Sequence, residues 1–257
     1  NVYRSLPTPN VQHQILPPPP PQPQAQPSII NLNSPRFNKP PVLENREKKA
    51  YLSPVIPDGP ISPEEAIEKY SSLLTRYEMT EILEFPSIYY LGINYRKIEA
   101  DPSNKFNYGF DTTDNSYKLV NGDHIAYRYE VLFSLGSGAF GQVVKVLDHK
   151  TGEQVAIKII VNTKQMRNEG QLESQILSRL NQKSCPNVVQ TYDHFIFRNH
   201  VCITFEILGR DLYELIHGRT YSRLLKPFSD SQIRSYTFQI FQGLAGIHEA
   251  GIVHCDI

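Results

Sequence analysis

Three glycines between two β-rich runs constrain the fold of this chain more than any other feature. Gly136, Gly138 and Gly141 have the spacing Gly-x-Gly-x-x-Gly, with one β-rich run at 129–135 and another at 142–147. In a doubly wound dinucleotide-binding fold, such a loop opens a helix. Here the following residues include three valines, which favour a strand. The context therefore excludes the doubly wound fold and leaves two interpretations, a phosphate-covering hairpin or a plain glycine-rich turn.

A third β-rich run favours the phosphate-covering hairpin. A turn at 150–153 leads into the run 155–161, and three strands with short connections predict an antiparallel meander. The third run contains Lys158 in the sequence Val-Ala-Ile-Lys, which together with the glycines is typical of ATP-phosphate binding in protein kinases. A charge in an apolar strand needs partners. A solvated edge lysine is the alternative.

The next segment supplies the expected partner for Lys158. Residues 164–181 predict a helix whose apolar stripe consists of Leu172, Ile176, Leu177 and Leu180. Glu173 borders that stripe and is our first choice for the ion pair. Glu169, one turn earlier, is the second choice. A solvated glutamate on the helix surface is the alternative.

A hairpin and a short helix follow. The runs 194–197 and 200–205 flank Arg198-Asn199 and predict two paired strands. Residues 206–208 then predict an extended hinge whose backbone hydrogen-bonds adenine. A short helix follows over 211–216. Its first residue, Asp211, either contacts a ribose or is an ordinary acidic residue at a helix N-terminus.

The last segment predicts a long helix followed by a polar motif. Ser229-Asp-Ser-Gln232 is a capping box, and Gly251 is placed to end the helix. We expect Ile233, Tyr236, Ile240, Leu244 and Ile247 to be inside. A short strand at 252–253 precedes His254-Cys255-Asp256. Three adjacent ligand types cannot surround one metal ion without strain, so we do not interpret this motif as a metal site.

Composition separates the N-terminal part from the rest. Twelve of the 20 prolines lie within residues 1–41, so 1–61 predicts a disordered tail with polyproline II character. A solvated linker is the favoured interpretation, and docking of an SH3 or WW domain is the other. Capping boxes at Ser62 and Thr75 then predict helices in an accessory region, 62–126, with a short strand at 87–92.

Charge and cysteine content exclude several classes of function. Lys+Arg and Asp+Glu both number 26, so the chain has no dominant basic field for nucleic acid. No apolar run reaches 18 residues, which argues against a membrane span. Three cysteines do not make a disulfide framework in a chain this long. They indicate reduced thiols in an intracellular protein, cytoplasmic or nuclear.

Several motifs together resemble the dual-specificity tyrosine-phosphorylation-regulated kinases, the DYRK family, and in particular its class II members. They are Ser-Pro-Glu-Glu-Ala from Ser62, Phe-Pro-x-Ile-Tyr-Tyr-Leu-Gly-Ile from Phe85, the box at 123–131, and Cys255 in place of the usual Arg. The resemblance implies an α+β, protein kinase-like fold. An antiparallel N-lobe sheet with its helix and the hinge would span 127–208, and the start of the helical C-lobe would span 209–257.

The resemblance also implies a site and a reaction. Asp256 would accept the proton of a protein Ser, Thr or Tyr hydroxyl, with Lys158 and Glu173 as the other catalytic residues. Phe205 would be the gatekeeper. The accessory region would assist tyrosine autophosphorylation. The ATP site would comprise Leu135, Gly136, Ser137, Gly138, Ala139, Phe140, Gly141, Val143, Ala156, Lys158, Phe205, Glu206, Ile207, Leu208 and Asp211.

The chain departs from the family pattern in three ways. Ile257 replaces a usual Leu, Asp211 replaces a usual Asn, and no Asp-Phe-Gly occurs. We therefore expect a C-terminally truncated fragment, inactive alone, with no metal site of its own and with the Mg²⁺ ligands beyond Ile257. Its start at Asn1 also suggests a missing N-terminus. The alternatives are a non-catalytic binding module that uses the proline tract and accessory helices, or a pseudokinase.

Overall fold

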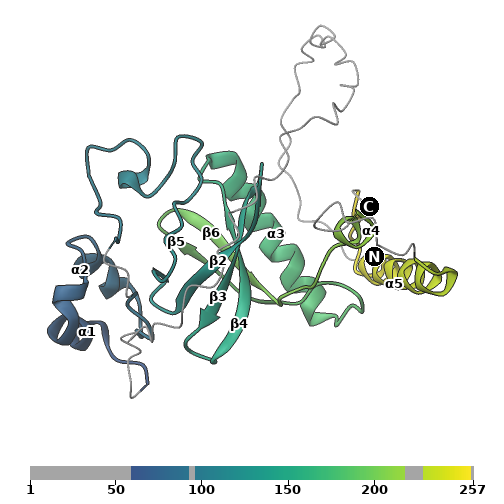
Figure 1. Ribbon diagram of the computed structural model, residues 1–257, viewed down its shortest axis with the longest axis horizontal. Helices are drawn as coiled ribbons and strands as arrows, with labels where there is room; N and C mark the ends of the chain where they lie inside the picture. The colour runs from purple at the N-terminus through teal and green to yellow at the C-terminus, as the bar shows by residue number, and fades with distance from the viewer. Residues whose placement is uncertain (1–58, 93–95, 218–227, 256–257) are drawn as a thin grey trace, which may run out of the picture. The chain divides into compact units, whose positions relative to one another are not determined.

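The computed structural model describes residues 59–92, 96–217 and 228–255 (Figure 1). All of them fall within one compact unit, Lys39–Ile257. The proline tract and most of the tail expected at 1–61 lie outside the described residues, as do Asp256 and Ile257. No helix in the described ranges is both long and apolar enough to cross a membrane.

An antiparallel sheet forms the centre of the described chain. Its strands run in the order β1-β2-β3-β4-β6-β5, and all neighbours are antiparallel (Figure 1). They are β1 His124–Ile125, β2 Tyr129–Gly138, β3 Gly141–Asp148, β4 Glu153–Ile160, β5 Thr191–Phe197 and β6 His200–Phe205. The predicted meander and hairpin are confirmed, as is the antiparallel fold class. The two-residue β1 is too short to show periodicity and was not predicted.

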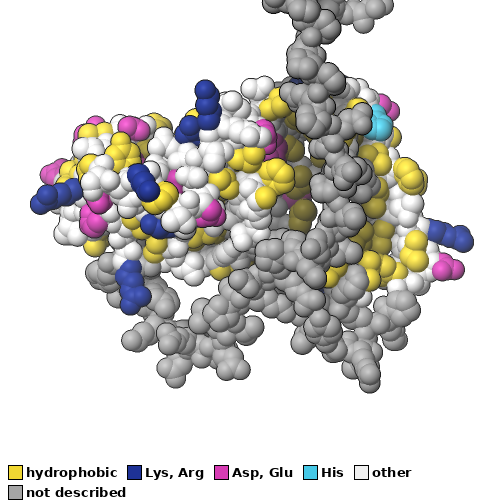
Figure 2. All heavy atoms as spheres, turned by 90° about the horizontal axis from the view of Figure 1, so that it is seen from above, with side chains coloured by type: hydrophobic (Ala, Val, Ile, Leu, Met, Phe, Trp, Pro, Cys, Tyr) yellow, Lys and Arg dark blue, Asp and Glu magenta, His cyan; other side chains and the backbone are white. Residues whose placement is uncertain are grey.

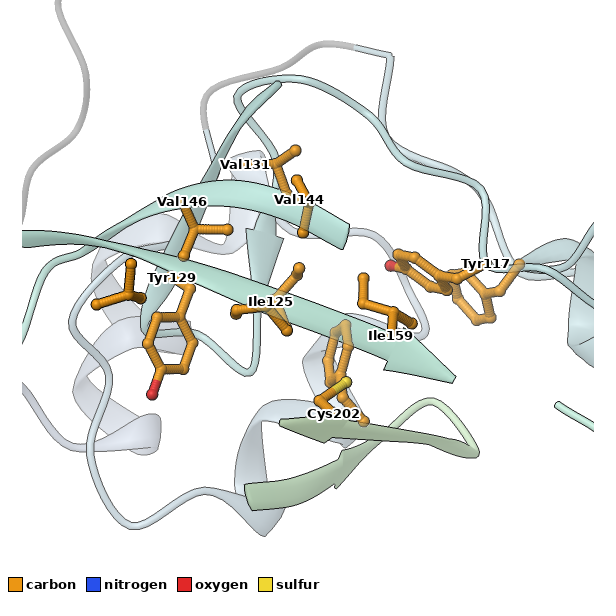
Figure 3. Packing of buried hydrophobic residues seen from close by; sticks show 12 residues of the cluster. Tyr117, Ile125, Tyr129, Val131, Val144, Val146, Ile159 and Cys202 are labelled. Atoms are coloured by element: carbon orange, nitrogen blue, oxygen red, sulfur yellow. The ribbon is translucent and has the colours of Figure 1, made fainter. Parts of the chain in front are cut away.

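One face of the sheet packs against the accessory region. Val144, Val146, Ile157 and Ile159 alternate along β3 and β4 with residues of the other face, as the two-residue period of a strand requires. Figure 3 shows this buried cluster, to which the preceding segment contributes Phe110, Tyr117 and Ile125. The accessory segment therefore completes the hydrophobic core of the sheet.

Helix α3, Lys164–Gln182, covers the other face and contacts β4, β5 and β6. The Thr163 side chain caps its N-terminus by accepting a hydrogen bond from the Met166 amide at 3.2 Å. The predicted helix is confirmed. Its predicted stripe is wrong at Leu172, which is 57% exposed, because Gly170 and Ser174 are buried against the sheet instead.

The accessory region consists of short helices and irregular backbone. It contains α1 Pro63–Tyr70 and α2 Glu78–Glu81, with 3₁₀ turns at Ser71–Leu73, Ile82–Glu84 and Asn107–Gly109. Thr75 and Glu78 form the expected capping box, because each accepts a hydrogen bond from the other's amide. The strand predicted over 87–92 is wrong, since Ile88 makes only an isolated bridge, with Ile61.

Arg198, in the turn between β5 and β6, anchors the accessory region through buried charges. Its guanidinium bonds Glu81 at 2.9 Å, Glu78 at 3.4 Å and the Tyr117 hydroxyl at 3.1 Å. It also lies over the Phe110 ring, 4.1 Å from the centroid. Because the Arg198 side chain is only 2% exposed, these partners replace water as its ligands.

Among the described residues after the hinge, two segments are helical, α4 Leu212–His217 and α5 Asp230–Glu249. The Ser229 capping box is confirmed, and Gly251, with φ of +76°, ends α5 as predicted. The predicted inner face is wrong at Ile233 and Ile240, which are 50% and 41% exposed. Figure 2 shows, in yellow, hydrophobic side chains that are exposed on the face drawn there. The strand expected at 252–253 is wrong too, because these residues form no ladder with the rest of the described chain.

Candidate active site

An ion pair between a strand and a helix lies at the centre of the candidate site. Lys158 Nζ on β4 donates to both carboxylate oxygens of Glu173 on α3, at 2.7 and 2.8 Å. The two side chains are 26% and 36% exposed, so the pair is partly open to solvent. Glu169, the second choice as partner, instead accepts a hydrogen bond from Gln165. The sequence placed Glu173 here only by its position beside the apolar stripe.

The glycine hairpin connects β2 and β3. Gly138 pairs with Gly141 across the turn formed by Ala139 and Phe140, so the motif is a strand-turn-strand. A Cβ at Gly141 would lie 2.1 Å from the Ile159 carbonyl oxygen, so the fold itself requires glycine there. A Cβ at Gly136 or Gly138 would meet no atom within 4 Å. At these two positions a missing side chain leaves open space beside the backbone.

The register places several predicted residues on one face of the sheet. Val143 is opposite Lys158, and Ala156 is opposite Phe205. Directly opposed residues in an antiparallel pair point to the same side, and residues two apart along a strand share a face. This is the face that α3 covers through Ile160 and Ile203. The glycine hairpin forms one end of the same strands, and its Leu135 and Phe140 are exposed at 47% and 62%.

The expected hinge is extended chain after β6. The Glu206 side chain accepts a hydrogen bond from the Gln190 amide, which fixes the start of the hinge to the start of β5. Within the described part of the chain, no hydrogen bond uses the backbone of Ile207 or Leu208. These polar groups are therefore available to a ligand.

Asp211 caps α4. Its Oδ1 accepts a hydrogen bond from the Glu214 amide at 2.6 Å, which is the usual role of an aspartate at a helix N-terminus. The geometry therefore gives Asp211 a function within the fold. The sequence left open whether Asp211 contacts a ribose or is an ordinary acidic residue at a helix N-terminus. The second interpretation accounts for this contact without a ligand.

A comparison with protein-family profiles matches residues 129–257 to the family described as Protein kinase domain. The chain belongs to the protein kinase family. The matched residues of this kinase domain include the glycine hairpin, the Lys158–Glu173 pair and the hinge described above.

Curated relatives of this kinase domain belong to the DYRK family, which confirms the resemblance found in the sequence. The dual specificity tyrosine-phosphorylation-regulated kinase 3 of Homo sapiens is 40% identical over 201 residues, 77% of this chain and 34% of the relative. The human dual specificity tyrosine-phosphorylation-regulated kinase 4 is 38% identical over 221 residues, which are 84% of this chain and 42% of the relative. The DYRK-family kinase pom1 of Schizosaccharomyces pombe is 40% identical over 72% of this chain and 17% of its own length. The chain thus spans about a third of the length of the first of these relatives.

The C-terminal motif of the kinase domain is only partly described. His254 and Cys255 are exposed, and Asp256, the expected base, lies outside the described residues. Elsewhere in the described ranges, Glu78, Asp123 and His124 offer a set of metal-ligating atoms. Lys97 Nζ lies 3.0 Å from Glu78 and 4.0 Å from Asp123, so its ammonium occupies the position of a cation there.

Sequence reasoning missed a set of buried polar residues that join the accessory region to the kinase domain. They are Glu78, Glu81, Asp111, Arg198 and His200. The only local signal was a charged or polar residue amid apolar neighbours, which does not identify its partner. Each partner lies many residues away, so only the fold shows the pairing.

Proposed function

We propose that this kinase domain binds ATP beneath the glycine hairpin and that the whole protein of which it is part transfers the γ-phosphate to Ser and Thr hydroxyls of protein substrates and to its own Tyr. The Lys158–Glu173 ion pair is the observation that carries the proposal. It lies on the sheet face shared by Val143 and Ala156, and a lysine held there is placed to meet phosphates.

The central residues of the predicted site each have a physical role in this reaction. Lys158 orients the α- and β-phosphates, and Glu173 holds the lysine in place. Backbone amides of the glycine hairpin approach the phosphates, for which the open space at Gly136 and Gly138 leaves room. The hinge backbone binds adenine, with Phe205 as gatekeeper. Asp256 takes the proton of the attacking hydroxyl.

The residues fit ATP at the phosphate and adenine ends. Mg²⁺, when bound with ATP, would neutralise the charge that develops on the phosphates. We propose that its ligands are not among these 257 residues, which contain no Asp-Phe-Gly. For that reason we expect the polypeptide 1–257 to bind ATP without transferring phosphate to a generic acceptor protein.

The proposed organisation follows the sequence. Residues 127–208 form the N-lobe and hinge, and 209–257 begin the C-lobe. The accessory region 62–126 assists tyrosine autophosphorylation. The burial of Phe110 and Tyr117 against the sheet supports a direct structural link between that region and the N-lobe. The three cysteines are free thiols in the fold, which supports action inside the cell.

Affinity labelling tests the proposal at a single atom. An adenosine carrying a sulfonyl fluoride at its 5′ end reacts with a nearby lysine amine, forming a sulfonamide and releasing fluoride. We expect peptide mass spectrometry to locate the label on Lys158 and ATP to slow the reaction. Labelling spread over exposed lysines such as Lys164, with no protection by ATP, would refute an ATP site beneath the hairpin.

A further inference from the structure

The segment Asn107–Tyr117 of the accessory region reaches the connection between β4 and α3. Its buried Asp111, 1% exposed, is the centre of this contact. Asp111 Oδ1 lies 2.8 Å from His200 Nε2 and accepts a hydrogen bond from the side-chain Nδ2 of Asn107 at 2.9 Å. Asp111 Oδ2 accepts a hydrogen bond from Asn162 Nδ2 at 2.8 Å. Both carboxylate oxygens are therefore used within the chain.

His200 links Asp111 to the end of β4. Its Nδ1 lies 2.7 Å from the Ile160 carbonyl oxygen and its Nε2 faces Asp111. The pair joins the accessory segment to the end of β4, directly before the connection to α3.

Asn162 carries the contact from Asp111 to α3. Its backbone amide donates to the Asn115 carbonyl at 2.9 Å, and its side-chain amide donates to Asp111. The oxygen of the same side chain accepts a hydrogen bond from Arg167 Nη1, on the first turn of α3, at 2.9 Å. Asn162 is thus held by the accessory segment on one side and holds the helix on the other.

The position of Glu173 relative to Lys158 depends on how the N-terminal turn of α3 is attached. Gly170 lies so close to the sheet that an added Cβ would be 3.0 Å from Ile160. Glu173 follows less than one turn later. About 9 Å of helix separates Arg167 from Glu173, so a tilt or rotation at the first turn changes the distance from Glu173 to Lys158.

We propose that Asp111 and Asn162 are positioning residues, which hold α3 through Arg167 so that Glu173 meets Lys158. This inference rests on the proposed function, because the ion pair matters for catalysis only if the site binds ATP. It gives the accessory region a defined route to the active site, Asp111 to Asn162 to Arg167, distinct from its hydrophobic contribution to the core.

Hydrogen exchange of the purified chain, read by mass spectrometry, tests the route without nucleotide. Asn162→Ala removes the link from the side of the accessory region, and Arg167→Met removes it from the helix with little risk to folding. Each substitution should speed hydrogen exchange over residues 164–174 roughly three- to tenfold, which corresponds to the loss of one or two hydrogen bonds. Exchange in β2, β3 and β4 should not change. Thr112→Ala is the matched control, since the Thr112 hydroxyl bonds only within its own turn.

The outcomes separate the two proposals. Faster exchange confined to α3, together with slower labelling of Lys158 by the adenosine sulfonyl fluoride, supports both. Faster exchange confined to α3 in a chain whose Lys158 is never protected by ATP supports the positioning route and refutes the proposed function. Exchange that is unchanged in α3, or that rises equally across the sheet, overturns the positioning role.

Discussion

The three glycines of the β2–β3 hairpin are glycine for different reasons. Gly141 is required by the fold, because its φ of +141° and the Ile159 carbonyl leave no room for a Cβ. Gly136 and Gly138 have free space and no positive φ. Their lack of a side chain therefore has no explanation inside the described chain and is explained by a ligand that approaches the backbone.

This difference predicts opposite effects of the same substitution. Gly141→Ala should lower the free energy of unfolding by several kcal/mol, on the order of the cost of a forced backbone clash. Gly138→Ala should change it by less than about 1 kcal/mol and instead weaken ATP binding. Denaturant unfolding and ATP titration of both variants measure the two effects. Equal destabilisation by both would show that the open space at Gly138 is not real.

Arg198 shows a second residue-scale effect, the cost of breaking a buried charge network. Arg198→Met keeps much of the side-chain volume but leaves Glu78 and Glu81 without their guanidinium. We expect a loss of about 3–5 kcal/mol in the free energy of unfolding. The control is Lys69→Met, which removes an exposed ion pair with Glu65 on α1 and should leave the free energy of unfolding nearly unchanged. A similar loss for both variants would contradict the account.

At the scale of elements, periodicity predicted the strands and helices of the kinase domain well. β3, β4 and α3 carry their periods in apolar residues that the core buries, so the sequence alone was sufficient. The exceptions have physical reasons. Leu172 lies outside the buried stripe because the close approach of α3 at Gly170 selects a different face. Within 87–92, Ile88 and Leu91 pack in a buried cluster with Ala66 of α1 and with Tyr127, and the segment does not pair as a strand.

The attachment of the accessory helices predicts a dependence on pH. Burial alone would raise the pKa of the Glu78 carboxyl, but the hydrogen bond from His124 and the Lys97 ammonium hold it well below its ordinary value of 4.5. A carboxyl whose pKa is lower in the folded state stabilises the fold above its unfolded pKa. That contribution is lost progressively as the pH falls below about 4.5.

Denaturant unfolding between pH 7 and pH 3 measures this loss. We expect the free energy of unfolding to fall steeply below pH 4.5 in the native chain and less steeply in Glu78→Gln, whose amide does not titrate. Glu64→Gln, an exposed change on α1, should keep the steep decline. If Glu78→Gln declines as steeply as the native chain, the acid sensitivity has another source.

At the scale of the whole molecule, the described chain is a sheet packed on one face by the accessory segment and on the other by α3. The sequence names most members of the candidate site from short motifs, and it ranks Glu173 first from helical spacing alone. It could not predict the links from Asp111 to Asn162 and His200, since these residues are 51 and 89 positions apart in the chain. Such contacts depend on the tertiary fold, which local periodicity does not encode.

The central claim, that Lys158 and Glu173 act together in an ATP site, is tested most directly by titration calorimetry of ATP. Lys158→Met and Glu173→Gln should each weaken ATP binding by about tenfold or more. The double variant should bind ATP as tightly as the single variant that has the lower ATP affinity. Lys164→Met, an exposed change at the start of α3, should bind as the native chain does. Native affinity in Lys158→Met, or losses that simply add in the double variant, would contradict the account.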